Sequence, residues 1–312
     1  MNLPKIVCSS VIRASQRGDS HGGIYMVDLA TDKVDLLLDW DRPDIDWDGR
    51  GGDRGVRGMA FYNGRLLAAA GDEVFEFDRD MKVTRSWRSR WLKHTHEVAL
   101  DKERGLLYVI ANIYDAILVL DLNGGYWRGA FILPKVPEEG ECARWIDVYQ
   151  GEPRGTDHLH LDSVVLQGSR LYYGGQHIEA LHWVDLKTTE IHTYQRDVPH
   201  SHNLQPYADG VIYNIASAHR TVYVRSDGER IDEWETPLYA KSDMEDRHAD
   251  EKIAVQGYTR GMVLWGDYVI VGSSPATVNV FEPLKKGPTH SVQLSKDVRN
   301  SICGIALCEW GE

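Results

Sequence analysis

The sequence contains no long hydrophobic run and few cysteines. No stretch among its 312 residues approaches the 18 apolar residues that a membrane-spanning helix requires. Four cysteines in a chain of this length do not make a disulfide framework, and the N-terminal residues show no apolar segment followed by a cleavage site. We therefore predict a cytoplasmic protein with free thiols and no membrane partner.

Basic residues are also outnumbered. The chain has 35 Lys and Arg against 47 Asp and Glu, for a formal net charge of −12, and its basic residues form no stripe. A negative protein repels phosphate backbones, so nucleic acid is not expected as a partner. With 42% hydrophobic and 26% charged residues, the composition is that of a folded chain and excludes wholesale disorder.

Sustained helical periodicity is missing outside one very polar segment at 239–254. The apolar runs are short, rich in Val, Ile, Leu and Tyr, and bounded by Gly, Asp or Asn, as in the run RGLLYVIANIYDAILVLDL. Such runs, separated by polar turns, are typical of β-strands. The sequence therefore predicts an all-β protein.

Six segments repeat one pattern along the chain. They begin at Arg57, His96, Asp162, His202, Arg260 and Cys303. Three of the spacings between them are 39, 40 and 43 residues, and the other two, 66 and 58, are the same unit enlarged by insertions at about 133–158 and 236–256. A period near 40 residues with four strands in each unit predicts the blades of a β-propeller.

The two ends of the chain together supply the strands of one repeat. The C-terminal run SICGIALC has the pattern of a first strand with no strands after it, and the N-terminal runs KIVCSSVI, GIYMVDL and KVDLLLD lack a first strand. Together they make a sixth blade, so residues 1–312 are predicted to form a single six-bladed propeller with four antiparallel strands in each blade. In this repeat pattern the whole chain resembles the six-bladed β-propeller superfamily of gluconolactonase, paraoxonase and NHL-repeat type. WD40 repeats match less well, because Gly-His and Trp-Asp pairs do not recur in each unit.

Propeller geometry gathers the histidines on one face. In each blade the loop before the first strand and the loop between the second and third strands open on the same face, and ten of the thirteen histidines fall in those places. The pairs HTH, HLH and HSH occur at equivalent positions of three consecutive repeats. Strand alternation then predicts two rings around the channel. The lower ring offers His96, Asp162 and His202 as metal ligands, and the upper ring offers His94, His160 and His200.

Imidazole and carboxylate donors suit zinc, iron, manganese or copper, and three protein ligands leave a coordination position open. The lower ring is preferred because it lies deeper and includes a carboxylate, but the sequence leaves both sets open. A network of histidines that only hydrogen-bonds between blades is the alternative.

Four further residues are candidates for catalysis. Arg57 and Arg260 occupy equivalent repeat positions, each followed by Gly-Met, and a guanidinium at a channel mouth can hold an anion through paired hydrogen bonds. Tyr258 and Glu97 are candidate proton carriers. Cys303 shares the repeat position and is either a soft ligand or nucleophile, or an inert buried thiol.

The acidic segment 39–55 contains Asp44, Asp46 and Asp48 in the opening D-x-D-x-D-G pattern of a calcium loop. Position 12 of such a loop would be Gly55, where a glutamate is required. A structural calcium site and a solvated acidic loop are the two interpretations.

These residues favour a metal-dependent enzyme, a lyase or hydrolase, that acts on a small anionic substrate at the channel mouth, with the two insertions on the same face. In architecture and residue types the chain resembles peptidyl-hydroxyglycine amidating lyase, a propeller that holds zinc through histidines of separate blades. An iron- or copper-dependent oxidoreductase at the same site is the first alternative. A non-catalytic propeller that binds a ligand or a partner is the second. The oxygen-ligand calcium site of the lactonases fits less well, since the rings here carry mainly His and Arg.

Overall fold

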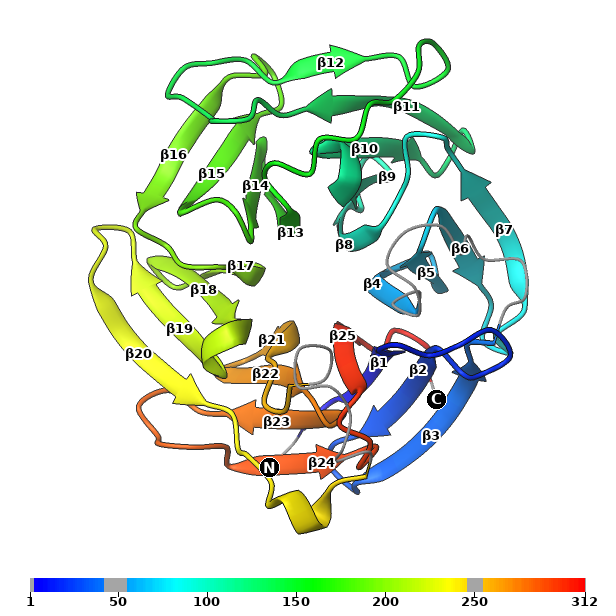
Figure 1. Cartoon of the computed structure of the whole chain (residues 1–312), viewed down its shortest axis with the longest axis vertical. Coiled ribbons are helices and arrows are strands. Elements are labelled where there is room, and N and C mark those ends of the chain that lie inside the picture. Colours follow the sequence, from blue (N-terminus) through cyan, green and yellow to red (C-terminus); the bar gives the residue numbers. More distant parts are fainter. Residues whose placement is uncertain (1–2, 42–54, 246–254, 312) are drawn as a thin grey trace.

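A computed structural model describes residues 3–41, 55–245 and 255–311 of the chain. Six antiparallel sheets stand in a ring around a central axis, and each sheet presents its first strand to that axis (Figure 1). Helix in the described residues is confined to the three-residue 3-10 turns η1 (Asn112–Tyr114), η2 (Ala216–Ala218) and η3 (Lys241–Asp243). The predictions of an all-β chain and of a six-bladed propeller are confirmed.

Five blades follow one another along the chain. The first is β4 (Val56–Tyr62), β5 (Arg65–Ala70), β6 (Glu73–Phe77) and β7 (Val83–Arg88), and the second is β8 (Thr95–Asp101), β9 (Leu106–Ala111), β10 (Ala116–Asp121), β11 (Tyr126–Ile132) and β12 (Arg144–Ile146). The third is β13 (Leu161–Gln167), β14 (Arg170–Gly175), β15 (Ala180–Asp185) and β16 (Ile191–Arg196), and the fourth is β17 (His202–Tyr207), β18 (Gly210–Ile215), β19 (Arg220–Arg225) and β20 (Arg230–Glu235). The fifth is β21 (Arg260–Trp265), β22 (Tyr268–Ser273), β23 (Thr277–Phe281) and β24 (His290–Gln293).

Both ends of the chain build the sixth blade, as predicted. Its sheet has the order β25-β1-β2-β3, with β1 (Lys5–Ile12), β2 (Gly22–Asp28), β3 (Lys33–Asp39) and the C-terminal strand β25 (Asn300–Leu307). β25 pairs with β1 from Ile6 opposite Leu307 to Ile12 opposite Asn300. The backbone hydrogen bonds of this pairing close the ring (Figure 1).

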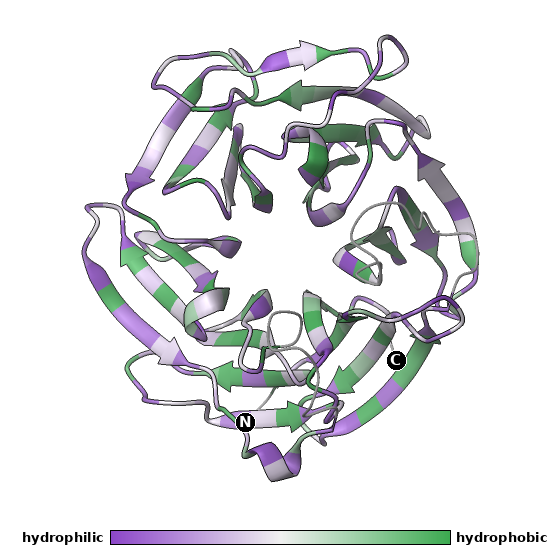
Figure 2. Ribbon diagram, in the orientation of Figure 1, coloured by the Kyte–Doolittle hydropathy of each residue, from purple (hydrophilic) through white to green (hydrophobic). Residues whose placement is uncertain are grey.

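The hydrophobic core is divided among the blade interfaces. In the described residues six buried apolar clusters each lie between two neighbouring blades. Alternation along β9 shows how one strand serves two of them, because Leu106, Tyr108 and Ile110 pack toward the third blade while Leu107 and Val109 pack toward the first. The second strand β9 is therefore apolar on both faces, whereas the outermost strand β20 mixes polar and apolar residues (Figure 2).

One blade departs from the expected four strands. β12 lies within the predicted insertion at 133–158 and adds a fifth strand beside β11. In the described part of the chain no helix is long and apolar enough to cross a bilayer. The cytoplasmic location, the single-domain boundaries and the placement of both insertions on the active face stay predictions.

Candidate functional site

Every blade carries an irregularity in its first strand at the same level of the ring. In β4, β8, β13, β17 and β21 the pairing register shifts within a few residues of the strand start, and β25 skips Cys303 where it pairs with β1. The residues at or beside these shifts are Arg57, His96, Asp162, His202, Arg260 and Cys303. A β-bulge inserts an unpaired residue and turns its side chain away from strict alternation. The six repeat positions found in the sequence are thus the bulge positions of the propeller.

Two histidines that precede the first strands, His94 and His160, have an unusual backbone conformation. His94 has φ +56° and His160 has φ +48°, both in the left-handed region that few non-glycine residues adopt. Such a residue breaks the alternation on which the two predicted rings depended. His160 is consequently drawn to the level of the lower ring.

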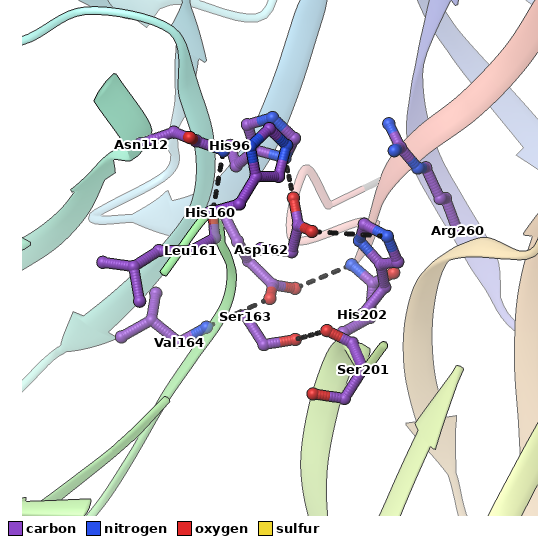
Figure 3. A network of polar contacts seen from close by, with 12 residues as sticks. His96, Asn112, His160, Leu161, Asp162, Ser163, Val164, Ser201, His202 and Arg260 are labelled. Carbon is purple, nitrogen blue, oxygen red and sulfur yellow. Dashed lines mark hydrogen bonds and ion pairs between the residues drawn. The ribbon is translucent and has the colours of Figure 1, made fainter. Parts of the chain in front are cut away.

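The cluster is centred on Asp162. Its Oδ1 lies 2.8 Å from Nδ1 of His96, and its Oδ2 lies 3.5 Å from Nε2 of His202, so one carboxylate lies between imidazoles of two other blades (Figure 3). The ring of His160 is 5.9 Å from that of His96, and His94 is 5.1 Å from His96, as measured between ring centroids. The structure therefore brings together five of the six predicted ligands.

Donor atoms of His96, His160 and Asp162 all lie within 4.8 Å of one another, and this set takes one residue from the predicted upper ring and two from the lower. The three side chains are buried, at 7%, 2% and 2% exposure. His200, the remaining predicted ligand, is exposed and does not belong to this group of donors. Its assignment as a ligand stays a prediction without support from the geometry.

Several of these buried candidate ligand atoms lack hydrogen-bond partners. Both carboxylate oxygens of Asp162 and Nε2 of His96 lack a hydrogen bond of acceptable geometry within the described part of the chain. Buried polar atoms in folded proteins are nearly always hydrogen-bonded, and an exception points to an ion or water held there. The buried group of His96, His160 and Asp162 could therefore hold a metal ion.

Burial sets the protonation of the imidazoles. It lowers the pKa of His96 well below its usual value, and the charge of Arg57 lowers it further. Burial likewise lowers the pKa of His202 well below its usual value, against the opposing effect of Asp162. Both rings are therefore neutral at physiological pH, the form in which imidazole donates to a metal.

Positive charge surrounds this neutral cluster. The charges of Arg57 and Arg260 both lower the pKa of His96, and Arg260 lies beside His202 (Figure 3). Arg57 is only 3% exposed, and the guanidinium carbon of Arg260 lies 4.7 Å from the ring centroid of Tyr258. Tyr258 in turn lies 6.3 Å from the ring of His202. The two predicted arginines and the predicted tyrosine thus lie near the cluster, while their roles stay predictions.

Glu97 lies between blades in a polar network. Its Oε1 accepts a hydrogen bond from Nδ2 of Asn203 at 2.9 Å, and its Oε2 accepts one from the backbone N–H of Val164 at 3.2 Å. Asn203 Oδ1 accepts from the N–H of Gly261 at 2.7 Å. Burial, with a smaller effect of Asp162, raises the pKa of Glu97 to about 8. This network joins the strands that carry His96, Asp162, His202 and Arg260, while a role for Glu97 as a base stays a prediction.

Two supporting residues were missed from the sequence. Asp157 Oδ1 lies 2.8 Å from Nδ1 of His160 and orients that ring, and Asn203 holds three blades together. Asp157 stands three residues before His160, a spacing that has no meaning until the left-handed turn at His160 is known. Asn203 follows His202 directly, and its positive φ of +53° is typical of asparagine.

Two other predictions lie outside the cluster. Sγ of Cys303, which is partly buried, contacts the carbonyl oxygen of Ser301 at 3.6 Å, and its role as a ligand or nucleophile stays a prediction. Asp44, Asp46 and Asp48, the proposed calcium ligands, lie outside the described residues.

Comparisons with known proteins identify the fold only. No protein-family model matches the sequence, and no curated protein matches it either. A chain of a nidogen–laminin complex superposes with a TM-score of 0.65 at 12% identity, over 99% of this chain and 100% of that one. A protein of unknown function from Bacteroides caccae gives 0.60 at 7% identity over 97% and 98%, and the WD40 repeats of RRP9 give 0.50 at 9% over 77% and 63%. This chain therefore shares the propeller fold, while its site must be interpreted from its own residues.

Proposed function

We propose that this propeller is a metal-dependent enzyme that binds one divalent transition metal ion through His96, His160 and Asp162 and acts on a small anionic molecule. The observation that carries the proposal is the buried carboxylate of Asp162, which lies 2.8 and 3.5 Å from nitrogens of two imidazoles and makes no hydrogen bond of acceptable geometry in the described part of the chain. Ligand atoms that bind one zinc ion at about 2.0–2.2 Å lie about 3.4 Å apart in a tetrahedron, so small side-chain rotations suffice to close the set. Zinc, iron, manganese and copper are all compatible with these donors.

Three protein ligands leave a coordination position for water or substrate. A metal ion at such a position polarises a substrate oxygen or lowers the pKa of bound water, which is the chemistry of hydrolases and lyases. Arg57 and Arg260 would hold the anionic group, since their charges act on the same cluster. His202, 3.5 Å from the second oxygen of Asp162, would carry the proton.

Metal analysis of protein purified without an affinity tag tests the proposal. We expect about one equivalent of zinc, iron, manganese or copper in the wild type, and loss of that metal in His96→Ala and His160→Ala. His182→Ala is the matched control. His182 is also buried, at 4% exposure, but it lies on the third strand of its blade, β15, and not on a first strand that carries the proposed ligands. Stoichiometric metal in both site variants, or none in the wild type after incubation with each ion, would reject the site.

The ligand set also favours one alternative reaction. Two histidines and one carboxylate form the facial triad of non-haem iron oxygenases. Iron(II)-loaded protein that consumes oxygen in the presence of small organic acids would favour this oxidoreductase over a lyase or hydrolase. A propeller that binds a ligand without turnover is the remaining alternative, and it is the outcome if no ion binds.

A further inference from the structure

A cleft of about 640 Å³ lies on the second blade, between its outer strands and the segment 133–158. Trp91 and Tyr114 stand among its walls with their rings edge to face, 5.9 Å apart, and Ile132, Leu133 and Ile146 add apolar surface. Lys135, Arg144 and Arg154 bring three positive charges to the same cleft. The cleft thus combines an aromatic wall with a cationic one.

The three cations have no ion pair in the described part of the chain. Three acids also line the cleft, and each has a partner. Glu152 pairs with Arg90 at 2.9 Å, Asp115 accepts hydrogen bonds from the backbone, and Asp147 accepts from the N–H of Tyr149 at 2.9 Å and from Nε2 of Gln150 at 2.8 Å. The three exposed cations are therefore available to a bound anion, although the chain as a whole is negative. Positive charge beside an apolar surface is complementary to an organic anion.

The cleft is connected to the histidine cluster by one short segment. Asp115 accepts hydrogen bonds from Oγ1 of Thr156 at 2.6 Å and from the N–H groups of His158 and Leu159 at 2.8 and 3.0 Å. Thr156 and His158 line the cleft, and the segment that they begin ends at His160 of the proposed metal site. A molecule held in the cleft would therefore lie beside the segment that positions a metal ligand.

We propose that this cleft binds a small aromatic anion, such as an aryl phosphate or an aryl carboxylate. Arg144, Arg154 and Lys135 hold the anionic group, because guanidinium and ammonium donors form charge-assisted hydrogen bonds with phosphate and carboxylate oxygens. The ring packs against Trp91 and Tyr114. That this anion is also the substrate rests on the proposed function, whereas its binding to the cleft does not.

Calorimetric titration of metal-free protein with phenyl phosphate tests the binding. We expect one binding site, with methyl phosphate bound at least about tenfold more weakly because it lacks the ring. We expect the double substitution Arg144→Gln/Arg154→Gln to weaken phenyl phosphate at least about tenfold, since each lost charge-assisted hydrogen bond contributes that much or more. Arg128→Gln is the matched control, because it removes an exposed arginine from a different cleft of the same blade.

Three results would overturn the proposal. They are no heat of binding at millimolar phenyl phosphate, equal binding of phenyl and methyl phosphate, and equal binding by the double variant and the wild type. Arg144 and Arg154 are exposed, so an unchanged thermal unfolding curve is expected for the double variant and checks its fold. Repeating the titration on His96→Ala separates the two proposals. Loss of metal in His96→Ala with retained phenyl phosphate binding supports both the metal site and the cleft. Loss of metal in that variant without phenyl phosphate binding in the wild type rejects the cleft alone, and retained metal in both site variants with phenyl phosphate binding rejects the metal site alone.

Discussion

His182 offers a direct test of how the blades bury titratable groups. The ring is 4% exposed and stacks on Tyr173, with centroids 5.5 Å apart, and its Nδ1 lies 3.5 Å from Oγ1 of Thr193. Burial, with a smaller contribution from the charge of Arg196, lowers the pKa of His182 to about 4. The folded protein therefore keeps this imidazole neutral over a pH range in which the unfolded chain protonates it.

The sign of the effect follows from proton binding. Between the unfolded pKa of about 6.5 and the folded pKa of about 4, the unfolded state holds the extra proton, so acid favours unfolding. The stability that His182 contributes is complete above about pH 6.5 and is lost as the pH falls toward 4. From pH 7.5 to pH 5 the two pKa values give a loss of about 2 kcal/mol. Because the ring also borders a cleft of about 330 Å³ that admits solvent, we expect about 1–2 kcal/mol.

Urea unfolding at a series of pH values measures this loss. We expect the stability difference between wild type and His182→Asn to shrink by about 1–2 kcal/mol from pH 7.5 to pH 5, because asparagine does not titrate. Thr193→Val, which keeps the imidazole and removes only the hydroxyl, should retain the wild-type pH dependence. A wild-type minus His182→Asn difference that stays constant over this range would refute the reasoning.

Three further predictions address the closure, the network and the site. Ile302→Ala, at 0% exposure in the cluster that joins the closing blade to the fifth, is expected to lower the free energy of unfolding by about 2–5 kcal/mol in denaturant titrations. Asn203→Ala leaves the N–H of Gly261 without its acceptor and is expected to cost about 1–3 kcal/mol in the same assay, and a change below about 0.5 kcal/mol would contradict the network. Asp162→Asn preserves the shape of the centre while removing its charge, so zinc affinity measured by competition with a chelator should fall at least about tenfold, and an unchanged affinity would exclude Asp162 from the site.

Much of the fold can be predicted from short stretches of the sequence. Short apolar runs and polar turns identify strands because alternation has a period of two along one segment. The spacings of 39, 40 and 43 residues between equivalent positions reveal the repeat, and the two longer spacings are the same repeat with insertions. The closing blade was predictable for the same reason, since each terminus shows which strand it lacks. β12 was not predictable, because its three residues become a strand only beside β11.

The sequence predicted where the candidate site lies, but it assigned only some of the histidines to the correct ligand set. The repeat brought His96, Asp162 and His202 to one level, and the structure agrees that they lie together. The separation into two rings assumed regular alternation, and the left-handed backbone at His160 does not obey it. His160 therefore joins His96 and Asp162, while His200 remains at the surface.

The sequence by itself determined the β-strands, the six blades and the blade built from both termini, because these follow from periodicity and from spacing along the chain. Only the tertiary structure decided which donors meet. Bulges, positive φ angles and the packing of one blade against the next set distances between residues that are dozens of positions apart. Those distances depend on the closed ring as a whole, and no single segment specifies them.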